Sequence, residues 1–124
     1  NSHSDVPGVS VGHAQDELAK TGTTVVAFDR AATASVSIVG QAPGTRDVAL
    51  LDSARTVQEI NAFVRSGGSA FGLSAIDPVV DWLASEGRGF SAGDFKVPIV
   101  PSAILFYLAN WRDHSCQRSS QRRR

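Results

Sequence analysis

Residues 60–83 read INAFVRSGGSAFGLSAIDPVVDWL, and this stretch carries the clearest structural signal in the chain. At its start Ile60, Ala62 and Val64 stand at every second position, a period that is typical of a half-buried strand. Ser66-Gly67-Gly68-Ser69 interrupts the alternation. Over residues 71–83 apolar residues recur mostly at three- and four-residue steps, as on one face of a helix. The stretch therefore predicts a strand that leads through Gly-Gly-Ser into a helix.

The glycine-rich turn has three possible interpretations. Backbone N–H groups at such a helix start can hold an anion, but neither GxGxxG nor GxxxxGK[ST] is present. Residues 67–71 nearly match the G-x-S-x-G nucleophile elbow, except that Phe71 replaces the last glycine. We favour a structural turn made by Gly67, Gly68, Ser69 and Gly72, in which the glycines adopt angles that a Cβ would forbid and Ser69 is the N-cap.

Pro78 predicts a break within the helix. A proline in a helix interior removes a hydrogen bond and clashes with the preceding turn, at a cost of about 3 kcal/mol. The alternative is a restart, with Asp77 as N-cap and Pro78 at the first helical position. We expect a helix over roughly residues 69–85 that bends near Asp77 and ends with Gly87 as its C-cap.

The rest of the chain predicts further strands and a loop. Residues 23–28 are β-branched and apolar, and we expect them to form a hairpin with residues 33–39 through a turn at Asp29-Arg30. Residues 15–22 and 40–47 are predicted loops. In the second loop Arg46 could clamp a substrate carboxylate, but we favour its pairing with Asp47 or Asp52. Residues 102–108 form a nearly continuous apolar run with the length of a buried strand.

Composition indicates a globular chain with one unusual end. The chain has 124 residues, of which 42% are hydrophobic and 19% charged, so it is one domain or part of one. Residues 1–111 hold seven Lys and Arg against eleven Asp and Glu, whereas residues 112–124 hold five Arg against one Asp. We expect a folded unit over residues 1–110 and a disordered Arg/Ser-rich tail over residues 111–124, with no nucleic-acid partner.

Cysteine usage and hydropathy indicate a cytoplasmic protein. A lone Cys116 excludes an internal disulfide, and no apolar run approaches the length that spans a bilayer. No secretion signal is visible at the start of the chain. His13 has no second His or Cys at metal-ligand spacing, so we interpret it as a surface or loop histidine and expect no metal.

Short blocks of the sequence, taken together and in order, resemble a known family. They are DVPGVSVGH (5–13), TGTTVVAF (21–28), APGTRD (42–47) with LLD (50–52), SGGSAFGLSA (66–75), WLASEGRGF (82–90) and VPIVPSAILF (97–106). They are similar to the N-terminal part of the DmpA-like family, which comprises L-aminopeptidase/D-esterases, β-aminopeptidases and nylon-oligomer hydrolases. The resemblance ends after about residue 108, where the sequence looks truncated or frameshifted.

The resemblance implies an α/β fold, specifically part of an αββα sandwich with the strand–GGS–helix unit at its centre. It also implies an N-terminal-nucleophile (Ntn) hydrolase, in which a self-processed Ser or Thr attacks a peptide or other amide bond and its own amino group acts as base. Such enzymes are homo-oligomers without metal or cofactor. The family's nucleophile and oxyanion Asn lie beyond the matching blocks, so the resemblance assigns no catalytic residue to this chain.

The chain departs from the family pattern at Phe106 and Tyr107. Members that cleave amides carry Tyr then Asp there, and the Tyr hydroxyl helps to hold the oxyanion. By family position Phe106 and Tyr107 would form the oxyanion or pocket wall. We therefore expect the chain to be inactive and poorly stable alone, and to act on a small peptide or amide only when completed. The alternative is a non-catalytic remnant or interaction module that pairs with another chain.

Overall fold

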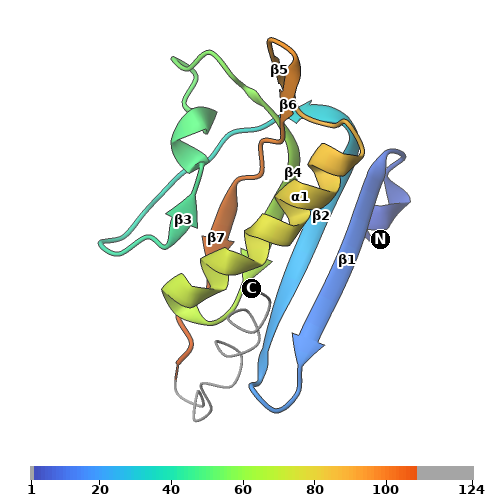
Figure 1. Ribbon diagram of the computed structural model, residues 1–124. Helices are drawn as coiled ribbons and strands as arrows, with labels where there is room; N and C mark the ends of the chain where they lie inside the picture. Colours follow the sequence, from blue (N-terminus) through green and yellow to red (C-terminus); the bar gives the residue numbers. More distant parts are fainter. Residues whose placement is uncertain (1, 109–124) are drawn as a thin grey trace, which may run out of the picture.

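The computed structural model describes residues 2–108, and this part of the chain is mixed α/β (Figure 1). The predicted α/β class is thus confirmed. The elements in chain order are the 3₁₀-helix η1 (His3–Asp5), β1 (Val9–Asp16), β2 (Thr21–Thr33), β3 (Thr45–Arg46), the 3₁₀-helix η2 (Val48–Leu51), β4 (Glu59–Ser66), the 3₁₀-helix η3 (Ser69–Ile76), α1 (Asp77–Ser85), β5 (Phe90–Ala92), β6 (Phe95–Val97) and β7 (Ser102–Ile104).

Five strands form one mixed sheet in the order β1-β2-β4-β7-β3. β1 with β2, β2 with β4, and β3 with β7 are antiparallel, whereas β4 and β7 are parallel. Parallel neighbours need a crossover connection, and here it runs through η3, α1 and the separate β5–β6 hairpin. In Figure 1 this crossover lays α1 along one face of the sheet.

β4 occupies the centre of the sheet and confirms the strand predicted at residues 60–65. It is more buried than a period of two predicts, because Asn61 on the face opposite Ala62 and Val64 is only 7% exposed. Asn61 is satisfied there, since its Oδ1 accepts from Ile99 N and its own N–H donates to Ile99 O, both at 2.9 Å. The expected half-buried strand is therefore confirmed, with Asn61 as the exception to the alternation.

The core lies between α1 and the sheet. It consists of buried apolar residues from the crossover and from three adjoining stretches: Ala27, Ala62, Val64, Ile76, Leu83 and Val100. Leu73, Val79 and Val80 pack against this cluster from η3 and α1. Burying one aliphatic side chain of this size contributes about 1.5–3 kcal/mol, so these contacts hold the crossover on the sheet.

The helical segment divides at Asp77, close to the predicted bend. η3 ends at Ile76 and α1 begins at Asp77, which places Pro78 in the first turn of α1, where its missing N–H costs no hydrogen bond. Asp77 is the first residue of α1 and not its N-cap, and the N-cap position of η3 is Gly68 and not Ser69. Gly87, with φ +67°, follows the helix end as predicted, and its N–H donates to Ala84 O.

The predicted hairpin between residues 23–28 and 33–39 is wrong. β2 continues through Asp29-Arg30 to Thr33, with a register shift between Ala27 and Ala32, and residues 34–39 form no strand. The hairpin is instead β1 with β2, and its turn lies in the predicted loop over residues 15–22. Asp16 Oδ1 accepts from Leu18 N and Ala19 N at 2.9 Å, which gives this turn the local hydrogen bonds that Asp29-Arg30 lacks.

The predicted strand over residues 102–108 is confirmed only at its start. β7 ends at Ile104, which pairs with Ser66, the last residue of β4. Beyond that point β4 offers no neighbouring strand, and residues 105–108 are exposed. These apolar residues are therefore not buried by any other part of residues 2–108.

The predicted tail over residues 111–124 lies outside the described residues. No helix within residues 2–108 is both long enough and apolar enough to cross a bilayer.

Replacing Leu83 tests whether α1 is held by its buried face. Leu83 is fully buried in the core, so Leu83→Ala should lower the free energy of unfolding by about 2–5 kcal/mol through lost contacts and a cavity. Trp82→Ala is the control, because Trp82 is 46% exposed, and it should cost clearly less. Urea unfolding followed by circular dichroism measures both, and equal losses would contradict this packing of α1.

Candidate functional site

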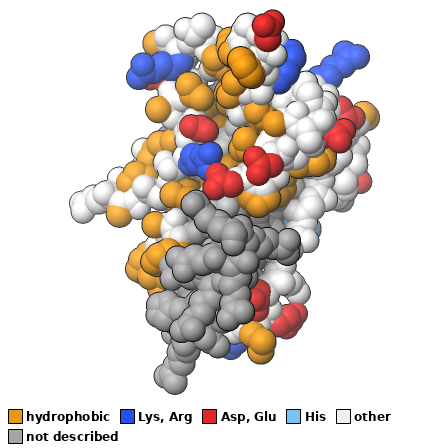
Figure 2. Space-filling model, viewed as in Figure 1, with side chains coloured by type: hydrophobic (Ala, Val, Ile, Leu, Met, Phe, Trp, Pro, Cys, Tyr) orange, Lys and Arg blue, Asp and Glu red, His pale blue; other side chains and the backbone are white. Residues whose placement is uncertain are grey.

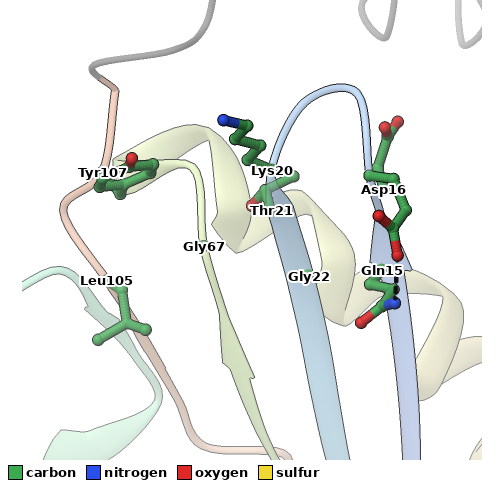
Figure 3. Close-up of a pocket in the computed structure, with 9 residues that line it drawn as sticks. Gln15, Asp16, Lys20, Thr21, Gly22, Gly67, Leu105 and Tyr107 are labelled. Carbon is green, nitrogen blue, oxygen red and sulfur yellow. Dashed lines mark hydrogen bonds between the residues drawn. The ribbon is translucent and has the colours of Figure 1, made fainter.

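A cleft with a volume of about 490 Å³ opens where three segments meet at one end of the sheet (Figure 3). The β1–β2 turn forms one side, Gly67 after β4 forms the floor, and the segment after β7 forms the other side. Its lining residues are Gln15, Asp16, Glu17, Lys20, Thr21, Gly22, Gly67, Leu105 and Tyr107.

The turn after β4 is bonded to both neighbouring segments. Gly67 N donates to Gly22 O at 2.9 Å, and Ser69 N donates to Leu105 O at 3.0 Å. Leu105 N in turn donates to Ser66 O at 2.8 Å. Because the N–H groups of Gly67 and Ser69 are engaged within the protein, they are not directed at a bound anion.

Two residues of the turn adopt the left-handed backbone region. Gly68 has φ +86° and Ser69 has φ +55°, although a serine rarely adopts this conformation. Such a residue costs of order 1–3 kcal/mol and persists only where its surroundings impose it. Here the hydrogen bonds of Gly67 and Ser69 on either side impose it.

Close packing explains two glycines beside the cleft. A Cβ built on Gly67 would lie 2.3 Å from Thr21 Oγ1, and one built on Gly72 would lie 2.0 Å from the carbonyl oxygen of Gly67. Both distances are well below any normal contact. The turn after β4 therefore folds back on itself in a way that only glycine permits at these positions.

The polar rim of the cleft comes from the β1–β2 turn. Asp16 caps that turn, and Gln15 Nε2 donates to Glu17 Oε1 at 2.9 Å. Lys20, with φ +49°, extends toward the side on which Tyr107 lies (Figure 3). The cleft thus carries two carboxylates, one ammonium and the Tyr107 phenol around a small apolar wall at Leu105. The sequence analysis missed this rim, because residues 15–22 carry no motif and look like an ordinary polar loop.

Phe106 and Tyr107, which the family resemblance placed at the oxyanion or pocket wall, point in different directions. Tyr107 lines the cleft, whereas Phe106 is 81% exposed and is not among the lining residues. Adjacent residues in an extended segment point to opposite sides, which accounts for the difference. Of these two residues, Tyr107 is thus the one whose side chain faces the cleft.

Arg46 lies outside the cleft and is engaged elsewhere. Its guanidinium pairs with the Asp77 carboxylate at 2.5 Å and lies 4.0 Å from Asp47. The hydrogen bond to Asp77 is the main cause that raises the pKa of Arg46 above its ordinary value, and partial burial opposes it. The predicted pairing of Arg46 with Asp47 is confirmed, although this contact is longer than the one with Asp77. The predicted alternative, a pairing with Asp52, was wrong. Arg46 thereby ties β3 to the first turn of α1.

His13 lies on β1 and is exposed, as expected for a surface histidine. Its Nδ1 is 2.9 Å from Thr24 Oγ1 on β2, so the structure brings a hydroxyl and an imidazole into hydrogen-bond contact. Within residues 2–108 no carboxylate hydrogen-bonds to His13, and no group of three or more His, Cys, Asp and Glu residues is placed to hold a metal ion. The pair therefore lacks the third group that orients a catalytic base.

Comparison with known proteins gives a consistent result. A family model described as Peptidase family S58 matches residues 1–123, which extends beyond residue 108, where the resemblance was expected to end. Uncharacterized aminopeptidases of Mycobacterium tuberculosis and Mycobacterium bovis are 42% identical over 116 residues, covering 87% of this chain and 34% of their own length. One from Mycobacterium leprae is 39% identical over 117 residues. The chain spans about a third of the length of these relatives.

Alanine substitution of two glycines tests the folded-back turn. Gly72→Ala should lower the free energy of unfolding by about 1–3 kcal/mol, since its Cβ would meet the Gly67 carbonyl and push the turn apart. Gly12→Ala is the matched control, because nothing lies within 4 Å of its Cβ. Thermal unfolding of the two variants measures the difference, and a Gly72→Ala variant as stable as Gly12→Ala would contradict the described geometry.

Proposed function

The chain belongs to peptidase family S58, and on this basis we propose that it supplies the N-terminal part of an aminopeptidase or related amide hydrolase. The observation that carries the proposal is the family match over residues 1–123, together with 42% identity to proteins named aminopeptidases. The chain spans about a third of the length of those relatives. We therefore propose that the activity belongs to a longer protein, to which this chain supplies the N-terminal part.

The proposed mechanism is that of an Ntn hydrolase. A Ser or Thr freed by self-processing would attack the carbonyl carbon of the scissile amide, and its own α-amino group would take the hydroxyl proton. Neither this nucleophile nor an oxyanion Asn is assigned to residues 2–108. The contribution of these residues is to form one wall of the site, with Tyr107 and the turn after β4 nearest to it.

The proposed fold is half of an αββα sandwich. Val64 packs toward α1, so Phe63 and the paired Val26 point to the opposite face of the sheet. On that face the Phe28 and Phe63 rings lie with centroids 6.3 Å apart and remain half-buried. A layered fold buries each apolar sheet face against another layer, and we propose that a second sheet takes this place.

The proposed substrate is a small peptide or amide with a free amine, and no metal or cofactor takes part. Homo-oligomerisation is proposed from the resemblance to the family. The second candidate function is a non-catalytic module that pairs with another chain. It is favoured by Phe106 and Tyr107, which stand where amide-cleaving members carry Tyr and Asp.

The purified chain should not hydrolyse aminoacyl p-nitroanilides above the buffer rate, because no nucleophile with an oriented base is assigned to residues 2–108. Release of p-nitroaniline, followed by absorbance, measures this. Turnover that disappears in Ser69→Ala or in Thr24→Ala would overturn the proposal and would place a nucleophile within the chain itself. Turnover that is unchanged in both variants would be traced to a contaminant.

A chimera tests the proposed function directly. Residues 2–108 would replace the matching segment of the Mycobacterium tuberculosis relative, and self-cleavage into two pieces would be followed by gel electrophoresis. Tyr107→Phe in the chimera should lower the amidase kcat about 100-fold, the scale of one oxyanion donor, because it removes the phenol that faces the cleft. Phe106→Leu is the control, since Phe106 is exposed and does not line the cleft. Absence of self-cleavage would contradict the proposed function, and cleavage with an unchanged kcat in Tyr107→Phe would contradict only the role of Tyr107.

A further inference from the structure

The β5–β6 hairpin is a two-stranded ribbon with one apolar face. Phe90 pairs with Val97, and Ala92 pairs with Phe95. Paired residues lie on the same face of a ribbon, and residues two apart along a strand share that face. All four apolar side chains therefore lie together, whereas the intervening pair, Ser91 and Lys96, lies on the reverse face.

The apolar face of this hairpin is exposed within residues 2–108. Phe95 is 76% exposed, and Phe90 and Val97 are each 46% exposed. Figure 1 shows the hairpin projecting from one end of the molecule, and Figure 2 shows hydrophobic side chains gathered at that end. Its reverse face is polar, and Lys96 Nζ donates to Ser91 Oγ there. The ribbon is thus amphipathic, and its apolar side is only partly covered within residues 2–108.

The hairpin is also firmly attached at its base. The Arg88 guanidinium donates to the carbonyl oxygen of Phe28, and Gly89 packs closely against the backbone of Val97 and Pro98. At its tip Gly93, with φ +62°, suits a two-residue turn that requires a positive φ at the first central position. The apolar face is therefore presented in a defined direction.

An isolated two-stranded ribbon is only marginally stable in water and needs packing against another element. The chain spans about a third of its relatives, so two-thirds of a family-length protein has no counterpart in it. We propose that the apolar face of the β5–β6 hairpin docks this remaining two-thirds of the family-length polypeptide. The inference rests on the proposed function, and it names the surface through which the N-terminal part joins the rest.

The exposed area of the hairpin face is too small to hold a separate protein by itself. At roughly 150–250 Å² for an aromatic side chain, the exposed fractions of Phe90 and Phe95 leave about 200–300 Å². A stable interface between separate proteins buries about 800 Å² on each partner. The hairpin face alone falls well short of that figure. A polypeptide that also covers the sheet face opposite α1 can supply the rest.

Co-expression tests the proposal. The tagged full chain would be expressed with the part of the Mycobacterium tuberculosis relative that follows its matching third, and the co-purified amount would be measured. Phe95→Ser and, separately, Phe90→Ser should each lower that amount at least tenfold. Lys96→Ser is the matched control on the reverse face and should leave it unchanged. Circular dichroism of each purified variant shows whether the fold is retained.

The outcomes separate this proposal from the proposed function. Equal co-purification of all variants would overturn the hairpin as docking surface, while self-cleavage of the chimera would still support the proposed function. Absence of any complex with the unsubstituted chain would overturn the hairpin proposal as well. A concentration-dependent dimer of the chain in sedimentation that Phe95→Ser dissociates, without effect on co-purification, would assign the surface to a second copy and overturn the proposed occupant.

Discussion

The parallel pairing of β4 with β7 sets the path of the chain through the whole described fold. This pairing joins segments nearly 40 residues apart in the sequence. Two backbone hydrogen bonds precede β7, from Asn61 N to Ile99 O and from Val64 N to Pro101 O, and β7 itself then pairs with β4. Because parallel strands cannot be joined by a tight turn, the intervening chain must cross one face of the sheet. That crossover carries Ile76 and Leu83 onto Val64 and so creates the core.

The same pairing places the candidate cleft. Where β4 ends, the chain must reverse over the sheet at once, and the segment after β7 stays beside it through the contacts of Leu105 with Ser66 and Ser69. The reversal forces Ser69 to a positive φ and brings Gly72 against the Gly67 carbonyl. The strain in this turn thus reflects the geometry of the crossover. A strained serine in a strand-to-helix turn is not in itself a sign of a nucleophile.

The polar groups of the β1–β2 turn and of β3 act mainly in holding the fold. Asp16 caps the β1–β2 turn, and Arg46 is bound to Asp77 across the β3–α1 contact. Exposed ion pairs of this kind typically contribute under about 1 kcal/mol, so the Arg46 pair orients more than it stabilises. This agrees with the proposal that residues 2–108 form one wall of a site and that the reacting groups belong to another part of a family-length protein.

The amino-acid sequence was enough to predict β4, the helical segment after it and the family, but not the hairpin partner of β2. The change of period across Gly67-Gly68 predicted β4 and the helical segment that follows it, and Pro78 predicted that this helical segment divides near Asp77. The short sequence blocks, taken in order, pointed to the family that the comparison identified. These signals are local, since each depends on neighbours in the chain. Three further features are visible only in the folded structure: Asn61 is buried, Arg46 binds Asp77, and the β1–β2 turn lines the cleft. These outcomes depend on which distant segments pair, and the length of β7 likewise follows from where β4 ends and not from its own apolar residues.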